Sequence, residues 1–361
     1  MIFSSLVDMV GDGGAAVVAG ALVGFLFGAA AQQSRFCLRA ATIEVGRRIY
    51  GERLAVWLVA FATALTGVQM VILSGAFDPA GVRVLNMRGS LSGAAIGGAL
   101  FGVGMVLARG CPSRLLVLSG QGNLRAVLSG LVFAVAAQAS IAGVLSPLRN
   151  ALAGLWTVEG PALDLAALGG AGRVTGFLVA LLWIVPAVHL VRQSRIDPVR
   201  LAGAFAAGLA IILGWVVTFQ LARASFDPLP LKSITFSGPS AHTLMLLLSP
   251  PERLFDFDIG MVFGVFGGAF AAAFLAGELK LEGFEGGASM RRYLLGAVLM
   301  GFGAMLAGGC AVGSVSNAVL LATIGWVALV AMWGSSMLAD LLLDRGSAVP
   351  GPAPVTPAAV R

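Results

Sequence analysis

Long apolar segments recur along the whole chain and constrain its fold more than any other feature of the sequence. Nine segments approach the roughly 20 apolar residues that a helix needs to cross a bilayer. They lie at about 13–33, 53–75, 91–110, 124–146, 173–191, 199–222, 256–277, 293–312 and 318–343. Charged residues make up 11% of the chain, against about 25% in soluble domains. The sequence therefore predicts an all-α integral membrane protein, and disfavours a soluble enzyme, a secreted disulfide scaffold or a nucleic-acid binder.

The basic residues are distributed unevenly between the predicted loops. With an extracytoplasmic N-terminus, 16 of the 23 Lys and Arg residues fall in cytoplasmic loops. Because basic residues concentrate on the cytoplasmic side of membrane proteins, this predicts a cytoplasmic C-terminus and an odd number of spans. The net charge of +6 is then an orientation signal and a contact for membrane lipid, so we expect no nucleic-acid partner.

Some segments are neither complete spans nor ordinary loops. The stretches at about 76–92 and 229–250 are expected to form re-entrant or interfacial helices, because their apolar runs are too short to cross. Residues 344–361 are rich in Pro and Ala and are expected to be a disordered cytoplasmic tail. Residues 1–343 would then form a single polytopic membrane domain.

An internal repeat indicates that this domain consists of two related halves. Residues 97–111 align without gaps on residues 296–310, and the alignment ends on a Gly-Cys pair in both segments. The sequence therefore predicts two pseudo-symmetric inverted halves, at about 13–146 and 199–343, linked by residues 147–198. Inverted repeats of this kind are common among transporters.

A second match pairs two glycine stripes, each with one glycine every four residues. The matched residues are Gly20, Gly24 and Gly28 with Gly260, Gly264 and Gly268. Such stripes allow close helix packing in lipid, which is the interpretation we favour. If all nine segments cross completely, the cysteine-bearing repeats run in opposite directions but the glycine stripes run in the same direction. We therefore expect at least one segment in each half to be re-entrant.

The repeated Gly-Cys pairs are the strongest candidates for function. In each, an apolar helix ends at glycine and cysteine before a new apolar run begins, so Gly110, Cys111, Gly309 and Cys310 are candidate site residues. We expect Cys111 at the start of a helix near Pro112, and Cys310 a few residues before a helix that begins near Ser314. A helix N-terminus carries free N–H groups and partial positive charge, which favour an anion.

A third cysteine, Cys37, lies between Arg35 and Arg39 after the first glycine stripe. Taken alone, a cysteine in an apolar span is more often a small buried hydrophobic residue. Recurrence at a helix break favours function for Cys111 and Cys310. Arg35, Arg109 and Arg114 are expected to attract an anion at the entrances of a path.

Other polar residues give weaker signals. His189 is expected to be a satisfied residue near a span end, and Asp256 and Asp258 are expected at the water boundary. The two histidines and three cysteines lack the spacing of a metal site, and no phosphate-binding loop is present. We therefore expect no metal, no cofactor and no enzymatic activity.

These three cysteine segments resemble the YeeE/YedE family of bacterial inner-membrane sulphur-compound transporters. The matching pieces are Ser34 to Cys37, Arg109 to Cys111, Arg114 to Leu116, Gly120 to Asn123, and Gly308 to Cys310 with Gly313. The resemblance implies a helical bundle with inverted pseudo-symmetry, and thiosulfate uptake along a relay of three thiols that form transient S–H hydrogen bonds to the ion. It also implies a small TusA-like cytoplasmic sulfurtransferase as partner. Val315 and Asn317 depart from the family's glycine-rich continuation, so thiosulfate, a related oxyanion and a selenium compound all stay open as substrates.

Physical considerations fit such a substrate and leave two other hypotheses. A thiol is a weak donor and acceptor that can hold a soft sulphur loosely, as conduction requires. A potential of 100 mV, negative inside, opposes entry of a dianion by about 4.6 kcal/mol, so uptake needs a coupled ion or rapid consumption. The alternatives are a membrane thiol–disulfide redox protein, which needs two close cysteines, and a pore whose cysteines only contribute to packing.

Overall fold

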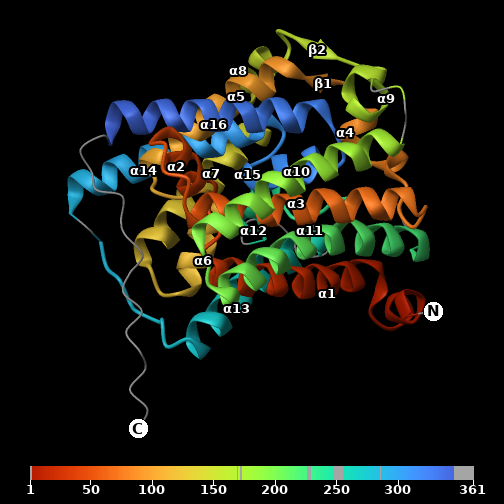
Figure 1. The fold of residues 1–361 in the computed structure, drawn as a ribbon, viewed down its shortest axis with the longest axis horizontal. Helices are drawn as coiled ribbons and strands as arrows, with labels where there is room; N and C mark the ends of the chain where they lie inside the picture. The colour runs from red at the N-terminus through yellow and green to blue at the C-terminus, as the bar shows by residue number, and fades with distance from the viewer. Residues whose placement is uncertain are drawn as a thin grey trace.

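The computed structural model describes residues 2–168, 170, 173–225, 229–246, 255–284 and 286–344. Of the predicted tail, residues 345–361 lie outside this part. The long helices run roughly along the longest axis of the molecule (Figure 1).

Helices account for nearly all of the regular structure that the described residues form. The α-helices are α1 (Ile2–Ser34), α2 (Leu38–Gly46), α3 (Glu52–Leu73), α4 (Arg83–Asn86), α5 (Leu91–Leu107), α6 (Pro112–Gly120), α7 (Leu124–Ala142), α8 (Ser146–Ala153), α9 (Leu165–Leu168), α10 (Arg173–Ser194), α11 (Pro198–Ala224), α12 (Ser237–Met245), α13 (Phe257–Leu275), α14 (Gly287–Ala307), α15 (Ala311–Ala318) and α16 (Thr323–Leu343). The short elements are the 3₁₀ turns η1 (Pro79–Gly81) and η2 (Gly160–Leu163) and the antiparallel strands β1 (Gly89–Ser90) and β2 (Thr157–Val158).

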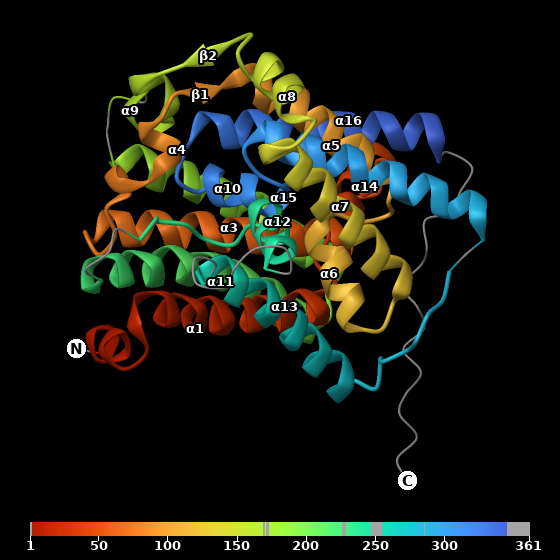
Figure 2. The same ribbon diagram turned by 180° about the vertical axis from the view of Figure 1, so that it is seen from behind.

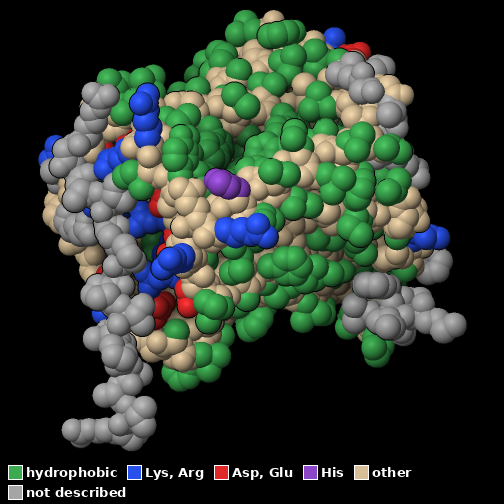
Figure 3. Space-filling model, viewed as in Figure 1, with side chains coloured by type: hydrophobic (Ala, Val, Ile, Leu, Met, Phe, Trp, Pro, Cys, Tyr) green, Lys and Arg blue, Asp and Glu red, His purple; other side chains and the backbone are tan. Residues whose placement is uncertain are grey.

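Nine helical segments of the described chain are long and apolar enough to cross a membrane, which confirms the predicted fold class. They contain α1, α3, α5, α7, α10, α11, α13, α14 and α16. Three of the segments also include a short helix after a break, namely α2 after α1, α6 after α5, and α15 after α14. Apolar side chains cover most of the face in Figure 3, as a lipid-exposed surface requires.

The glycine stripes bring α1 and α13 into backbone contact. A Cβ atom at Gly24 would meet the Met261 carbonyl oxygen, and one at Gly264 would meet that of Ala21. A Cβ at Gly28 would meet Val265, four residues further along α13, so the two helices are parallel. This pair therefore does not follow an inverted relation, and the stripes match because both helices need small residues at the contact.

The cysteine-bearing repeats also pack against each other, but in the opposite sense. The carbonyl oxygen of Gly303 on α14 lies against Gly97 on α5, and that of Gly296 lies against Gly104. The contacts run in opposite order along the two helices, so α5 and α14 are antiparallel. Their last turns, which precede Cys111 and Cys310, therefore lie at opposite ends of the contact.

Two layers of long helices enclose the short ones. Figure 2 shows α1, α11 and α13 on one side and α5, α14 and α16 on the other, with α12 and α15 between them. Of the predicted short element at 229–250, residues 247–250 lie outside the described part, and residues 229–246 contain an extended segment followed by α12, which packs against α7, α13 and α14. The stretch at 76–92 forms η1, α4 and β1.

Candidate functional site

Each of the three cysteines occupies the N-cap position of a short helix. Cys37 precedes α2, Cys111 precedes α6 and Cys310 precedes α15. The start of α6 at Pro112 agrees with the sequence prediction. The prediction for Cys310 was wrong in detail, because α15 begins at Ala311 and not near Ser314. Each thiol therefore lies beside the free N–H groups of a helix start, where partial positive charge favours an anion.

A left-handed residue ends the helix before each cysteine. Arg35 (φ 53°) lies two residues before Cys37, Arg109 (φ 55°) two before Cys111, and Gly308 (φ 77°) two before Cys310. A left-handed residue is a common way to end an α-helix, and it allows the chain to begin a new helix in another direction. The same backbone device thus positions all three thiols.

Cys310 lies where two helix N-termini meet. The backbone N–H of Phe236, the N-cap residue of α12, donates a hydrogen bond to the Cys310 Sγ at 3.2 Å. The Thr235 hydroxyl lies 3.8 Å from the same sulphur and 3.2 Å from the Ser237 hydroxyl. Ser314, in the first turn of α15, has a buried hydroxyl oxygen without a hydrogen-bond partner. This cluster offers both weak and strong donors to a small anion.

A cavity of about 430 Å³ opens beside this cluster. Three basic residues, Arg83, Arg88 and Lys232, line it. Its other polar lining residues are Ser90, Ser233, Thr235, Ser316 and Asn317, and Gly308 and Gly313 contribute backbone. Residues of α4, β1 and the start of α16 line this cavity, and Figure 2 shows these elements at the end of the bundle where α1 begins. We call this cavity the outer vestibule.

The other two thiols lie together. The Cys37 and Cys111 thiols are close enough to interact, and the Cys111 Sγ also lies 3.1 Å from the Ser113 hydroxyl. Arg114 is close enough to both sulphurs to interact electrostatically, and its Nη1 is buried without a hydrogen-bond partner. A guanidinium that is buried and only partly satisfied is costly unless an anion approaches it, so this thiol pair is a second candidate anion position.

Aromatic rings connect the surroundings of the thiol pair with those of Cys310. Phe27 contacts Phe36, the neighbour of Cys37, at a ring-centroid distance of 6.2 Å. The ring of Phe27 also lies 5.6 Å from the ring of Phe236, whose N–H binds Cys310. The Phe27 side chain is fully buried.

The remaining predicted site residues have different surroundings. Gly309 packs tightly on the first turn of α15, where a Cβ atom would lie 3.1 Å from the carbonyl carbon of Gly313. A Cβ atom at Gly110 would meet only ordinary contacts of 3.7 Å. Arg109 is exposed with its guanidinium 5.8 Å from the ring of Tyr293, and Arg35 forms an exposed ion pair with Glu278 at 3.3 Å. These two arginines lie at the surface near the pair, and neither is in contact with a thiol.

Sequence reasoning missed several residues of the site. Thr235, Ser237, Arg83, Arg88 and Lys232 lie outside the cysteine motifs, and only the two predicted short segments at 76–92 and 229–250 pointed to their regions. No periodicity in the sequence indicates that this segment approaches Cys310, because the approach depends on packing over a long separation in the chain.

Nine helical segments of the described chain that are long and apolar enough to cross a membrane define a multi-pass membrane protein, and each of its three cysteines lies at the start of a short helix. The chain belongs to the sulphur transport family, whose model matches residues 33–338. It is similar to the thiosulfate transporter TsuA of Escherichia coli (strain K12), with 25% identity over 353 residues, 89% of this chain and 94% of the relative. It is also similar to the thiosulfate transporter TsuA of Spirochaeta thermophila, with 29% identity over 326 residues, 86% of this chain and 94% of the relative.

Proposed function

We propose that this protein imports thiosulfate, or a closely related sulphur-containing anion, across the bacterial inner membrane. Membership of the sulphur transport family supports transport, and the printed names of the two relatives support thiosulfate. The observation that carries the proposal is that Cys37, Cys111 and Cys310 all occupy N-cap positions of short helices.

The chemistry of these positions suits a dianion with one soft sulphur. Free N–H groups stabilise the charge without adding a full positive charge that would trap the ion. The thiols can form weak S–H hydrogen bonds to the terminal sulphur. Weak binding at successive positions permits release at each one, which conduction requires.

The arrangement suggests an order for the steps. The anion enters the outer vestibule, where Arg83, Arg88 and Lys232 attract it, and then reaches Cys310. Movement of Phe27 gives access to Cys111 and Cys37, which would complete the relay. Arg114 at the thiol pair holds the anion before release to the other side.

The distribution of charge supports an extracytoplasmic N-terminus and a cytoplasmic C-terminus. On the face in Figure 3, most Lys and Arg side chains gather at the end where α14 begins and α16 ends. Because basic residues favour the cytoplasmic side, this end would face the cytoplasm and the outer vestibule would face the periplasm. A TusA-like sulfurtransferase would receive the anion or its sulphur at the cytoplasmic end, so this chain itself acts as a transporter and not as an enzyme.

One observation favours a second candidate, a thiol–disulfide redox function. The Cys37 and Cys111 thiols are close enough to interact, and disulfide formation needs two cysteines in proximity. A membrane redox protein would alternate between the dithiol and disulfide forms of this pair. Cys310 has its contacts with Thr235 and Phe236 instead, so this candidate assigns it no role.

Growth of a sulphur-starved bacterial strain tests the proposal. A strain that lacks its own uptake of sulphur anions would carry this chain and receive thiosulfate as its sole sulphur source. We expect growth with the wild-type chain and none with Cys310→Ala, although both proteins reach the membrane. Growth of the Cys310→Ala strain at the wild-type rate contradicts the proposal, and loss of uptake on reduction of the protein supports the redox candidate.

A further inference from the structure

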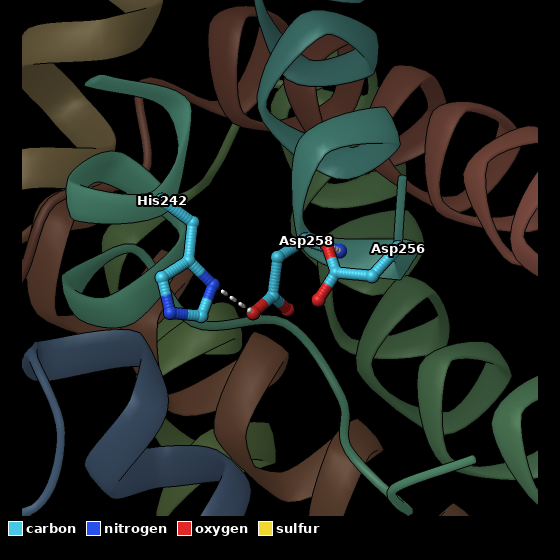
Figure 4. A group of neighbouring side chains, drawn as sticks. All are labelled: His242, Asp256 and Asp258. Atoms are coloured by element: carbon cyan, nitrogen blue, oxygen red, sulfur yellow. Dashed lines mark hydrogen bonds and ion pairs between the residues drawn. The ribbon is translucent and has the colours of Figure 1, made fainter. Parts of the chain in front are cut away.

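A cluster of four ionisable side chains lies at the N-terminal end of α13, beside the short helix α12. The Nζ of Lys232 lies 2.9 Å from a carboxylate oxygen of Asp256 and 2.9 Å from Oδ2 of Asp258. The Nδ1 of His242 lies 3.4 Å from the same Oδ2 (Figure 4). Lys232, from the segment before α12, and His242, from α12, therefore both contact the carboxylate of Asp258 on α13.

Asp258 is the centre of this cluster and is only 4% exposed. Asp258 lies in the first turn of the candidate span α13, but it is not open to water, because α12 and Lys232 of the preceding segment cover it. Its Oδ1 is buried without a hydrogen-bond partner, and Figure 4 shows both oxygens in the gap between His242 and Asp256. A buried carboxylate with an unsatisfied oxygen has capacity for a further positive charge or proton.

A metal ion does not suit this site, although His242, Asp256 and Asp258 have the geometry of a possible ligand set. The ammonium group of Lys232 already lies between the two carboxylates, where a cation would bind. A metal ion would have to displace that ammonium group or accept its repulsion at short range. The proton is the remaining positive species for this site.

The cluster is connected to the outer vestibule through Lys232. Lys232 lines the vestibule and also contacts Asp256 and Asp258. Three residues further along, Thr235 lies 3.8 Å from the Cys310 sulphur. An anion in the vestibule and the carboxylate of Asp258 therefore compete for the same ammonium group.

The charges of the cluster are not balanced while His242 is neutral. Asp256 and Asp258 together carry two negative charges and Lys232 carries one positive charge, so protonation of His242 makes the sum zero. The charged groups that act on His242 are Asp258, Asp256 and Lys232. Helices α7 and α14, which also pack against α12, carry charges only near their first turns, at Arg125, Arg291 and Arg292.

The electrostatic effects on the two basic groups agree with this geometry. The hydrogen bond to Asp258 raises the pKa of His242 above its usual value, although partial burial opposes the change. Burial acts to lower the pKa of Lys232, but the charges of Asp258 and Asp256 outweigh it, so that pKa is raised. Lys232 therefore stays charged, and His242 is the basic group of the cluster whose protonation can change.

We propose that His242 is a proton-binding site whose occupancy is linked, through Lys232 and Asp258, to anion binding in the outer vestibule. An anion attracts the Lys232 ammonium group away from Asp258, and the carboxylate then holds a proton on His242 more tightly. By reciprocity, protonation of His242 releases Lys232 for the anion and increases the anion's affinity. The inference rests on the proposed function because it requires a thiosulfate-like anion in the vestibule.

This linkage has a consequence for uptake. A dianion that enters together with one proton moves one net negative charge instead of two. The membrane potential then opposes its entry half as strongly. The site would thus supply part of the driving force that a dianion needs.

Binding of radiolabelled thiosulfate to the purified full chain, measured across the neutral pH range, tests the inference. In the wild-type protein we expect the affinity to fall with rising pH, by at most about tenfold per pH unit, between the His242 pKa of the anion-free protein and that of the anion-bound protein. In His242→Gln we expect the affinity to be independent of pH. In Asp258→Asn the fall should begin at a lower pH, because the His242 pKa loses the cause of its rise.

A matched control and a second measurement keep the result interpretable. His189, the other histidine, lies exposed on α10, and His189→Gln should retain the wild-type pH dependence. In NMR spectra of labelled histidine, thiosulfate should raise the His242 pKa and leave that of His189 unchanged. The same pH dependence in His242→Gln as in wild type, or thiosulfate binding without any pH dependence, overturns the inference and leaves the proposed function intact. Absence of thiosulfate binding at every pH overturns both.

Discussion

The backbone N–H of Phe236 donates a hydrogen bond to the thiol sulphur of Cys310 at 3.2 Å, across 74 residues of sequence. This contact joins the start of α12 to the start of α15, so that two helix N-termini lie at one thiol. A second bond, from the Ser316 hydroxyl to the Ile234 carbonyl at 2.8 Å, holds the same two segments together. The anion position at Cys310, which we call the outer anion position, thus depends on a tertiary contact and not on the cysteine motif alone.

Gly313→Ala is expected to block the outer anion position. Gly313 lines the outer vestibule, and a Cβ atom there would collide with the Thr235 hydroxyl and lie 3.8 Å from the Cys310 sulphur. The extra methyl group would force Thr235 away from the thiol, so thiosulfate uptake into proteoliposomes should fall by about tenfold or more. Gly334→Ala, at an exposed position of α16 without neighbours, is the control and should transport normally. Equal uptake by both variants would show that the space beside Cys310 is not used.

Gly264→Ala is expected to destabilise the bundle without any effect on the thiols. The added Cβ would collide with the Ala21 carbonyl oxygen at the contact of α1 and α13. Overpacking of this kind typically costs about 1–3 kcal/mol. Gly267→Ala on the same helix meets only the edge of Phe25 at 4.0 Å and should leave stability unchanged or slightly higher. Thermal unfolding in detergent measures both, and equal midpoints would contradict the packing account.

Arg114→Gln is expected to reduce transport more than it reduces stability. The buried guanidinium has an unsatisfied nitrogen beside Cys37 and Cys111. Hydrogen bonds to charged groups contribute roughly 1.5–3 kcal/mol, which corresponds to about a 10- to 100-fold loss of uptake. Arg149→Gln, at a half-buried residue of α8 that donates hydrogen bonds to its own neighbour Asn150, is the matched control. Normal uptake by Arg114→Gln would exclude Arg114 from the path.

The fold class and the backbone breaks could be predicted from the sequence, because their causes are local. Apolar length determines which segments can span, and glycine and proline determine where helices stop. The sequence therefore places Cys111 correctly at the start of α6. The start of α15 was misplaced because Gly308 adopts a left-handed conformation that ends α14 and lets the next helix begin at once.

The outer vestibule and the His242 cluster could not be predicted, because they depend on contacts between distant segments. Lys232 and Asp258 are separated by 26 positions that carry no recognisable motif, and Asp258 gives no sign in the sequence that it is buried. The relative direction of α1 and α13, which carry the two glycine stripes, could not be predicted either. A four-residue repeat predicts close packing but does not distinguish parallel from antiparallel helices.

The stability of the protein is expected to depend on pH through His242. Its pKa in the folded state is raised by Asp258, so its contribution is fully present below the unfolded value of about 6.5 and is lost as the pH rises through the folded value. Unfolding midpoints of wild type should therefore fall between mildly acidic and mildly alkaline pH more than those of His242→Gln. Circular dichroism in detergent measures this difference. An identical slope in the two proteins would show that the contact with Asp258 does not form.

The central claim is that thiols at helix N-termini bind the anion on its way through the membrane. Uptake of ³⁵S-labelled thiosulfate into proteoliposomes, with Cys37→Ala, Cys111→Ala and Cys310→Ala beside wild type, tests it most directly. The account predicts rapid uptake by wild type in a reducing medium and at least about a tenfold loss in each variant, although all three remain folded. Wild-type rates in the folded Cys111→Ala and Cys310→Ala variants would contradict it, because the cysteines would then serve only for packing.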